Sequence, residues 1–92
     1  MRLDHKRSSI EIIADMLRLG EAGKTEIMYS VNMSYFQLQK YLPYLLERGF
    51  IDRFKLGNPS VTYRVTEKGL KLLRSIDNIL ETLEFKEPEE EE

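Results

Sequence analysis

Apolar residues recur at helical spacing along most of this chain, and the clearest pattern lies between Thr25 and Gly49. The first part of this stretch predicts a short helix with one apolar side. The second part predicts a longer helix whose inner stripe carries Leu38, Leu42 and Leu45. The stretch therefore predicts two helices joined by a tight turn.

The residues at the ends of these two helices support this interpretation. Thr25 is expected to cap the first helix, and Asn32 is among the few non-glycine residues that tolerate the left-handed backbone of a sharp turn. Ser34 and Gln37 form a capping-box pair that opens the second helix, and Gly49 is expected to end it. Two helices joined in this way form a helix-turn-helix, in which the second helix is the candidate DNA reader.

An earlier helix is predicted from Ser8 to about Leu19. Ser8 and Glu11 form a second capping-box pair, and Gly20 is a natural stop at the other end. Its inner face is expected to carry Ile10, Ile13, Ala14 and Leu17, with Ile12 and Met16 beside them. Because this face is broadly apolar, we expect the helix to be well buried.

Pro43 lies inside the second helix of the helix-turn-helix. Proline has no backbone N–H, so a hydrogen bond to Gln39 is lost, and a bend or break between residues 39 and 43 is expected. The apolar stripe nevertheless continues through Leu45 and Leu46. We therefore predict one helix over residues 34–48.

Two extended segments follow, and they predict a β-hairpin over residues 51–65. The runs IDRFKL and VTYRV flank the turn-forming sequence GNPS. In the second run, the residues expected to face inward are Val61, Tyr63 and Val65. The first run alternates less cleanly, so the sequence leaves open whether Ile51 or Phe54 faces the core.

The last helix is predicted from Glu67, after a cap at Thr66, to about Phe85. It could lie back on its own domain, which would explain Leu70 and Leu73 but leave the apolar positions from Ile76 onward without a partner. We favour pairing of two chains, because the stripe has the spacing of a coiled coil. The residues expected to form the dimer contact are Leu72, Leu73, Ile76, Ile79, Leu80 and Leu83.

Composition and charge bound the possible functions. The 92 residues form one small domain, and with no cysteine and a single histidine the chain lacks thiolate metal sites and histidine clusters. Seven of the 16 acids and one of the 14 bases lie in residues 81–92, which leaves residues 1–80 with nine acids, 13 bases and a formal charge of +4. A mildly basic body with an acidic tail is compatible with binding to nucleic acid.

The order of elements, three helices, a hairpin and a long helix, is that of a winged helix-turn-helix. The run GFIDRFKLGNPSVTYRVTEKGLKLL looks like the wing and following helix of such domains. The run TEIMYSVNMSYFQLQKYLPYLLERGFI resembles small archaeal winged helix-turn-helix DNA-binding proteins that dimerise through a long C-terminal helix. The similarity covers roughly Ile10 to Leu83. It departs from the family at Phe36 and Gln39, where basic residues are usual, and at Pro43.

The resemblance implies an α+β fold that is mostly helical, with three helices, a two-stranded wing and a C-terminal dimerisation helix. We accordingly divide the chain into a flexible arm (1–7), the winged domain (8–66), a coiled-coil helix (67–85) and a disordered acidic tail (86–92). The implied function is that of an intracellular homodimer that binds double-stranded DNA as a transcription regulator or chromatin-type protein. We expect it in the cytoplasm, associated with the nucleoid.

Candidate DNA contacts follow from this arrangement. The 100° step of a helix places Phe36 and Lys40 opposite the buried Leu38. Glutamine can pair with adenine, lysine with guanine or phosphate, and phenylalanine with the thymine methyl group. The candidates on the helix-turn-helix are Lys24, Ser34, Tyr35, Phe36, Gln37, Gln39 and Lys40. Those on the wing are Arg53, Lys55, Asn58 and Arg64. Tyr35 and Tyr41 are expected at the edge of the core rather than as stacking platforms.

Other classes of function receive less support. We expect no enzyme, metal, cofactor, small-molecule ligand or membrane partner, because phosphate loops, metal-ligand spacings and nucleophile–base pairs are missing from the sequence. The alternative that stays open is a protein-docking module, since winged helices also serve that purpose. The exposed aromatic residues Phe36 and Tyr44 would suit such a role.

Overall fold

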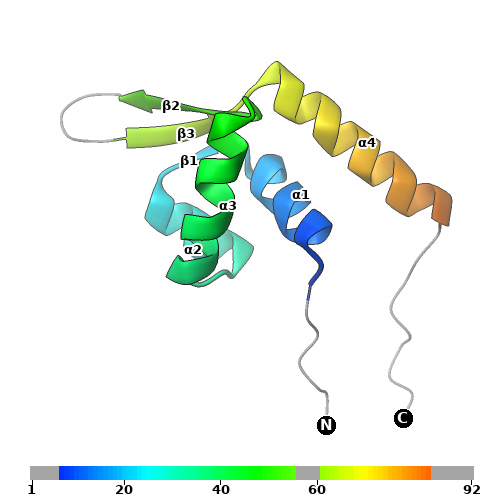
Figure 1. The fold of residues 1–92 in the computed structure, drawn as a ribbon, viewed down its shortest axis with the longest axis horizontal. Helices are drawn as coiled ribbons and strands as arrows, with labels where there is room; N and C mark the ends of the chain where they lie inside the picture. The colour runs from blue at the N-terminus through cyan, green and yellow to red at the C-terminus, as the bar shows by residue number, and fades with distance from the viewer. Residues whose placement is uncertain (1–6, 56–60, 84–92) are drawn as a thin grey trace, which may run out of the picture.

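The elements follow one another in the predicted order in a computed structural model that describes residues 7–55 and 61–83 (Figure 1). They are α1 (Ser9–Leu19), β1 (Glu21–Ala22), α2 (Lys24–Val31), α3 (Tyr35–Glu47), β2 (Ile51–Lys55), β3 (Val61–Val65) and α4 (Glu67–Leu83). The mostly helical α+β class and the winged helix-turn-helix arrangement are thus confirmed. The arm over residues 1–6, the tail over 86–92 and the expected helix end at Phe85 lie outside the described residues.

Helix α1 begins and ends as its sequence predicts, but its buried side is rotated. The capping box between Ser8 and Glu11 is formed, and Gly20 follows the helix with a φ of 88°. The buried side chains of α1 are Ile12, Ala14, Met16 and Leu17. Ile10 is 54% exposed, so its placement on the inner face was wrong. The helix packs against both α2 and α4, and this wider contact draws in the flanking positions, while Ile10 lies in the free first turn.

The helix-turn-helix forms as expected except at its first cap. Helix α2 begins after Gly23, which makes no side-chain capping bond, so Thr25 lies within the first turn and was wrongly assigned as the cap. Asn32 adopts the left-handed conformation, with φ 60° and ψ 56°. Ser34 and Gln37 form the predicted capping box at the start of α3, and Gly49 has a φ of 80°.

Helix α3 runs through Pro43 without the expected break. Pro43 and Gln39 both lie on the exposed side of the helix. The carbonyl of Gln39 that loses its N–H partner can therefore bind water, which limits the cost of the proline. The inner side of the same helix is fixed by Leu38 and Leu45, which are among the most completely buried side chains of the described residues.

The hairpin is part of a three-stranded antiparallel sheet, in the order β1-β3-β2. The sequence predicted two strands and missed β1, whose Ala22 pairs with Tyr63 of β3. Pairing of Ile51 with Val65 places Ile51 on the face that joins the core. Phe54 pairs with Thr62 on the other face, which answers the question that the sequence left open.

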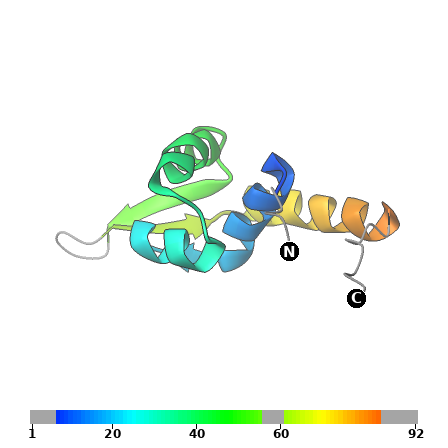
Figure 2. The ribbon, with the colours of Figure 1, turned by 90° about the horizontal axis from the view of Figure 1, so that it is seen from below.

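Helix α4 leaves the body in the direction opposite to the hairpin (Figure 2). Thr66 caps it, because the hydroxyl of Thr66 accepts a 3.0 Å hydrogen bond from the N–H of Gly69. The same hydroxyl donates a 2.7 Å bond to the carbonyl of Gly49, so the end of α3 and the start of α4 are joined through one side chain.

The first half of α4 packs on its own domain, further than the sequence indicated. Ile76 is only 7% exposed, whereas we expected it to lack a partner within the chain. Arg18 of α1 and Asp77 of α4 form an ion pair of 2.9 Å beside it. Leu70, expected to pack inward, is instead exposed. No described helix combines the length and apolar character that crossing a membrane requires.

Candidate nucleic-acid interface

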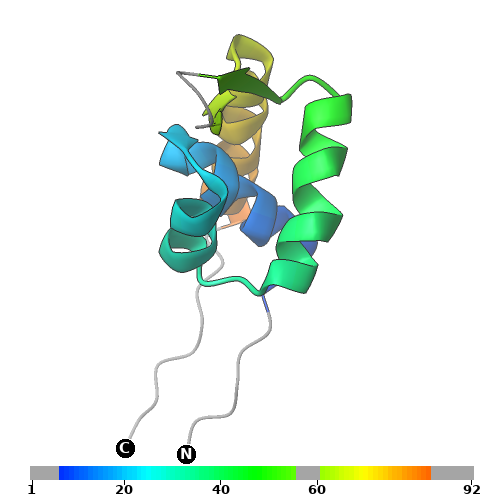
Figure 3. The same ribbon diagram turned by 90° about the vertical axis from the view of Figure 1, so that its left-hand side faces the viewer.

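The start of α3 is the most prominent candidate surface. Helix α3 lies along one edge of the molecule, and its outer side is clear of the other described elements (Figure 3). On that side Phe36 is 77% exposed and Tyr35 is 53% exposed, with Gln39 and Lys40 one turn further on. The predicted exposure of Phe36 and Lys40 is confirmed. Tyr35 does not pack at the core edge as expected, whereas Tyr41 is buried and its hydroxyl lies 2.9 Å from that of Ser9.

The capping box decides which polar groups at this end of α3 are free. The hydroxyl of Ser34 accepts a 3.1 Å hydrogen bond from the N–H of Gln37, and the side-chain oxygen of Gln37 accepts one of 3.1 Å from the N–H of Ser34. The amides of Tyr35 and Phe36 are left without an acceptor inside the helix, so they can bind an anion.

The two glutamine candidates differ as a result. A bidentate contact with adenine needs both polar atoms of an amide side chain. Gln37 already uses its oxygen in the capping box, so it would have to give up the cap to make that contact. Gln39 is exposed and uses only its nitrogen, in a weak 3.3 Å bond to the hydroxyl of Tyr35. Gln39 is therefore the better placed of the two.

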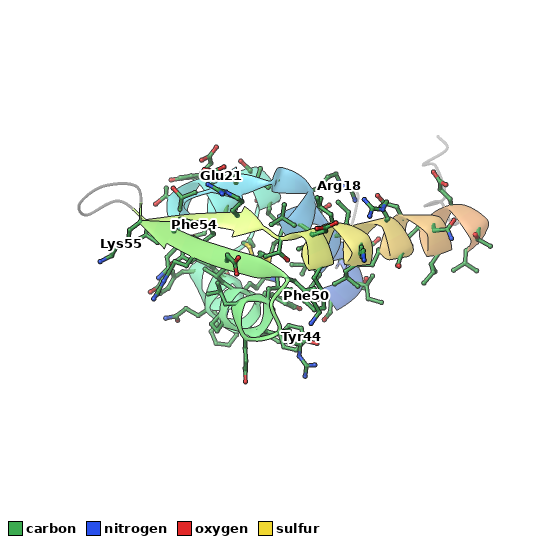
Figure 4. The ribbon with its side chains drawn as sticks, turned by 90° about the horizontal axis from the view of Figure 1, so that it is seen from above. Arg18, Glu21, Tyr44, Phe50, Phe54 and Lys55 are labelled. Carbon is green, nitrogen blue, oxygen red and sulfur yellow. The ribbon has the colours of Figure 1, made fainter. Side chains whose placement is uncertain are left out.

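The basic side chains of the hairpin lie on opposite faces of the sheet. Arg53 and Lys55 pair with Tyr63 and Val61, so they share the face that packs toward α3, and both are exposed. Lys55 ends the described part of β2, at the hairpin side of the molecule (Figure 4). Together with Lys24 at the start of α2 and Lys40 on α3, these residues supply the positive charge around the helix.

Arg64 stands apart from this group. Its guanidinium stacks on Phe54, with 4.1 Å between the guanidinium carbon and the ring centroid, and its Nε lies 3.4 Å from the carboxylate of Glu21. Both contacts are on the sheet face away from α3, where Arg64 also faces Asp52 across the strands. Its expected role in DNA binding therefore has no support from its position. Asn58, the remaining wing candidate, lies outside the described residues.

One residue that braces this surface was assigned to the flexible arm. Arg7 donates hydrogen bonds of 2.7 Å to the carbonyl of Val31 and of 3.0 Å to the carbonyl of Asn32, and it forms a 2.7 Å ion pair with Asp15. It therefore ties the turn of the helix-turn-helix to α1. The partners lie 24 and 25 positions away, so no local sequence signal identifies them. Tyr29 of α2, which is 82% exposed, was also missed.

The residues predicted to pair two chains do not form one free stripe. Leu72 and Leu73 pack against the core of their own chain, and Ile76 is buried there. Leu80 is half-buried. Ile79 and Leu83, in the second half of α4, are 57% and 66% exposed.

The described residues contain no cluster of three or more histidine, cysteine, aspartate or glutamate side chains that could hold a metal ion. The chemistry that the surface around α3 does offer consists of free backbone amides, an amide side chain, exposed aromatic rings and flanking cations. These groups bind phosphates and base edges.

Comparison with known proteins places this surface in context. A family model described as winged helix-turn-helix matches residues 6–84. The uncharacterized protein MJ0287 of Methanocaldococcus jannaschii is 34% identical over 85 residues, which cover 89% of this chain and 82% of that protein. MJ0290 of the same organism is also 34% identical, over 77 residues that make up 80% of this chain but only 34% of that protein.

Two solved structures are similar. Sso10a-2, a DNA-binding protein from Sulfolobus solfataricus, superposes with a TM-score of 0.76 and 31% identity, covering 85% of this chain and 83% of that one. ZitR of Lactococcus lactis, solved in complex with DNA, gives a TM-score of 0.61 and 22% identity, covering 87% of this chain and 57% of that one. At this lower identity the second match indicates a shared fold alone.

Proposed function

We propose that this chain, which belongs to the winged helix-turn-helix family, binds double-stranded DNA as a transcription regulator or chromatin-type protein. The observation that carries the proposal is the exposed start of α3, with two free amides at its tip and Arg53 and Lys55 on the hairpin face beside it. The description of the related Sso10a-2 as a DNA-binding protein supports it. Such a role would place the chain on the nucleoid, in the cytoplasm.

In this proposal the first turns of α3 enter the major groove. Residues at the N-terminal end of the second helix contact base edges in a helix-turn-helix, while flanking groups position the protein on the backbone. Phe36, Gln39 and Lys40 would then face the bases. Lys24 and Ser34, together with the two basic residues of β2, would contact phosphates.

We further propose that two chains pair through the second half of α4. Ile79 and Leu83 are exposed one turn apart, with Leu80 half-buried next to them. An exposed apolar strip on a helix that extends beyond its own domain is suited to a second copy of the same helix. A two-fold dimer would present two α3 helices to DNA, as expected for a repeated or palindromic site.

Reversal of two charges tests the proposal that DNA is bound by this face. We expect the double variant Lys40→Glu, Lys55→Glu to weaken binding to a mixed-sequence duplex, measured by fluorescence anisotropy. The slope of log affinity against log salt concentration should fall by about two, one for each lost phosphate contact. Lys71→Glu on the exposed side of α4 is the matched control and should leave both quantities unchanged.

The alternative function is protein docking, which the exposure of Phe36 and Tyr44 favours. The same titration separates the two functions. A DNA-binding protein loses affinity steeply as salt rises, because the bound phosphates regain their counterions. Undetectable binding to duplex DNA at low salt would reject the proposed function and leave docking.

A further inference from the structure

The start of α3 carries aromatic rings where a basic surface would be expected. Phe36 points directly away from the buried Leu38, two helix positions and therefore about 200° from it. Its ring is 77% exposed, and Tyr35 beside it is 53% exposed. Leaving an aromatic ring in water at the tip of a helix contributes nothing to the core, so its value must lie in what it touches.

The polar groups of this helix point to a particular base pair. Guanine is read most often by arginine, yet from Ser34 to Glu47 the helix has no arginine and a single lysine, Lys40. The side-chain nitrogen of Lys40 lies 5.3 Å from the ring centroid of Tyr41. Arg48 follows the helix at its far end, where it stacks on Tyr44 at 4.7 Å.

The groups that remain match an A·T pair. Thymine is distinguished in the major groove by its 5-methyl group, which apolar side chains contact, and adenine by a donor and an acceptor that an amide side chain can bind together. Phe36 provides the apolar contact, and Gln39, on the same side of the helix, provides the amide. Gln37 is withheld by the capping box.

We propose that Phe36 is a specificity-determining residue that contacts the thymine methyl group in the major groove and so gives this chain a preference for A·T pairs. The inference rests on the proposed function, because it requires α3 to enter the groove of duplex DNA. It goes beyond that function by naming the feature of DNA that is recognised. The flanking cations give affinity without choosing a sequence.

A single-atom-group change in the DNA tests this proposal. Replacing thymidine by deoxyuridine in an alternating A·T duplex removes only the methyl group. We expect the wild-type chain to bind the uracil duplex about fourfold more weakly for each methyl contacted, which is the fold-change for exposing one methyl-sized group. A second pair of duplexes, built from inosine with cytosine or with 5-methylcytosine, should show the methylated form bound more tightly.

Matched variants connect the effect to one side chain. Phe36→Ala should bind both A·T-type duplexes with the same affinity, close to that of the wild type for the uracil duplex. Tyr44→Ala removes an exposed aromatic ring from the far end of the same helix and should keep the wild-type difference. Because Phe36 is exposed, its replacement should leave the helical circular dichroism and the unfolding midpoint unchanged.

The outcomes separate the inference from its premise. Equal affinity of the wild-type chain for thymine and uracil duplexes, with binding still salt-dependent, would overturn the methyl contact and leave DNA binding standing. Tighter binding to the single strands than to the duplexes would also overturn it, because the rings would then stack on unpaired bases. Absence of binding to every duplex would reject the proposed function itself.

Discussion

The guanidinium of Arg7 donates a 2.7 Å hydrogen bond to the carbonyl oxygen of Val31, the last residue of α2. This bond satisfies a carbonyl that the end of the helix leaves without an N–H partner. Because the same guanidinium is paired with Asp15 on α1, the turn before α3 is held against the body of the domain. The orientation of α3 therefore depends on a side chain that precedes the first helix.

Removing this side chain should destabilise the domain. We expect Arg7→Ala to lower the free energy of unfolding by about 1–2 kcal/mol, because charge-assisted hydrogen bonds are lost at a site only partly screened by water. Arg7→Lys should recover part of the loss, since it keeps the charge but not the forked geometry. Urea unfolding measures both. A midpoint for Arg7→Ala equal to that of the matched exposed variant Arg74→Ala would show that the contact contributes nothing.

Ser34 offers a way to separate folding from binding. Aspartate is as good an N-cap as serine and its charge suits the positive end of a helix, so Ser34→Asp should unfold at a denaturant concentration close to that of the wild type. The added charge would repel a phosphate from the free amides of α3, and DNA affinity should fall at least tenfold at low salt. Ser34→Ala should show the opposite behaviour, with about 1 kcal/mol of stability lost. Undiminished affinity of Ser34→Asp would place the DNA elsewhere.

The two arginines of the hairpin provide a matched pair for locating the DNA. Arg53 lies on the face of the sheet toward α3, and Arg64 lies on the opposite face, where Glu21 and Phe54 engage it. We expect Arg53→Ala to weaken binding about threefold to tenfold, as loss of one phosphate contact does, and Arg64→Ala to leave it unchanged. Anisotropy titrations of the two variants at one salt concentration would reveal the reverse order if DNA binds the other face.

Gly69 should tolerate no side chain. A Cβ atom added there would collide with the carbonyl oxygen of Phe50 and lie 2.7 Å from Cγ2 of Val65. Backbone on one side and a packed valine on the other leave little room for relief, so Gly69→Ala should cost about 3 kcal/mol. Gly23→Ala is the control, because its nearest neighbour would lie at 3.6 Å, and it should cost no more than about 1 kcal/mol. Thermal unfolding that ranks the two variants equally would contradict the close approach.

The proposed pairing of chains can be tested on α4. Ile79→Glu combined with Leu83→Glu should give a monomer that remains folded, because both side chains are exposed within one chain. Ile76→Glu should instead unfold the domain, since that position is buried. Asn78→Glu, on an exposed neighbouring position, controls for the added charge. Sedimentation velocity gives the oligomeric state, and a wild-type monomer at high concentration would reject the pairing.

Local signals in the sequence were sufficient for most of the architecture. The capping pairs Ser8–Glu11 and Ser34–Gln37 act across three residues, and the leucine stripe of α3 repeats within one helix, so both can be read from a short window. The exposure of Phe36 follows from the same repeat. What these signals share is that each depends on neighbours close in the chain.

Features that depend on distant partners could not be predicted. Strand β1 has two residues, too few to show alternation, and exists because Ala22 meets Tyr63. The sheet face of Arg64 depends on the register of the hairpin, and the burial of Ile76 depends on how α4 crosses α1. Each of these is decided by tertiary packing, about which hydrophobic spacing alone carries no information.

The meeting of Gly69 with Phe50 has a mechanical consequence. Where a helix touches a strand through main-chain atoms alone, no flexible side chain can absorb a tilt, so α4 behaves as a stiff lever fixed to the sheet. If two copies join at the far ends of these levers, a rotation of one hairpin on its duplex would be transmitted to the other instead of being damped. Anyone who grafts this domain onto another protein would need to carry that glycine along to keep the linkage rigid.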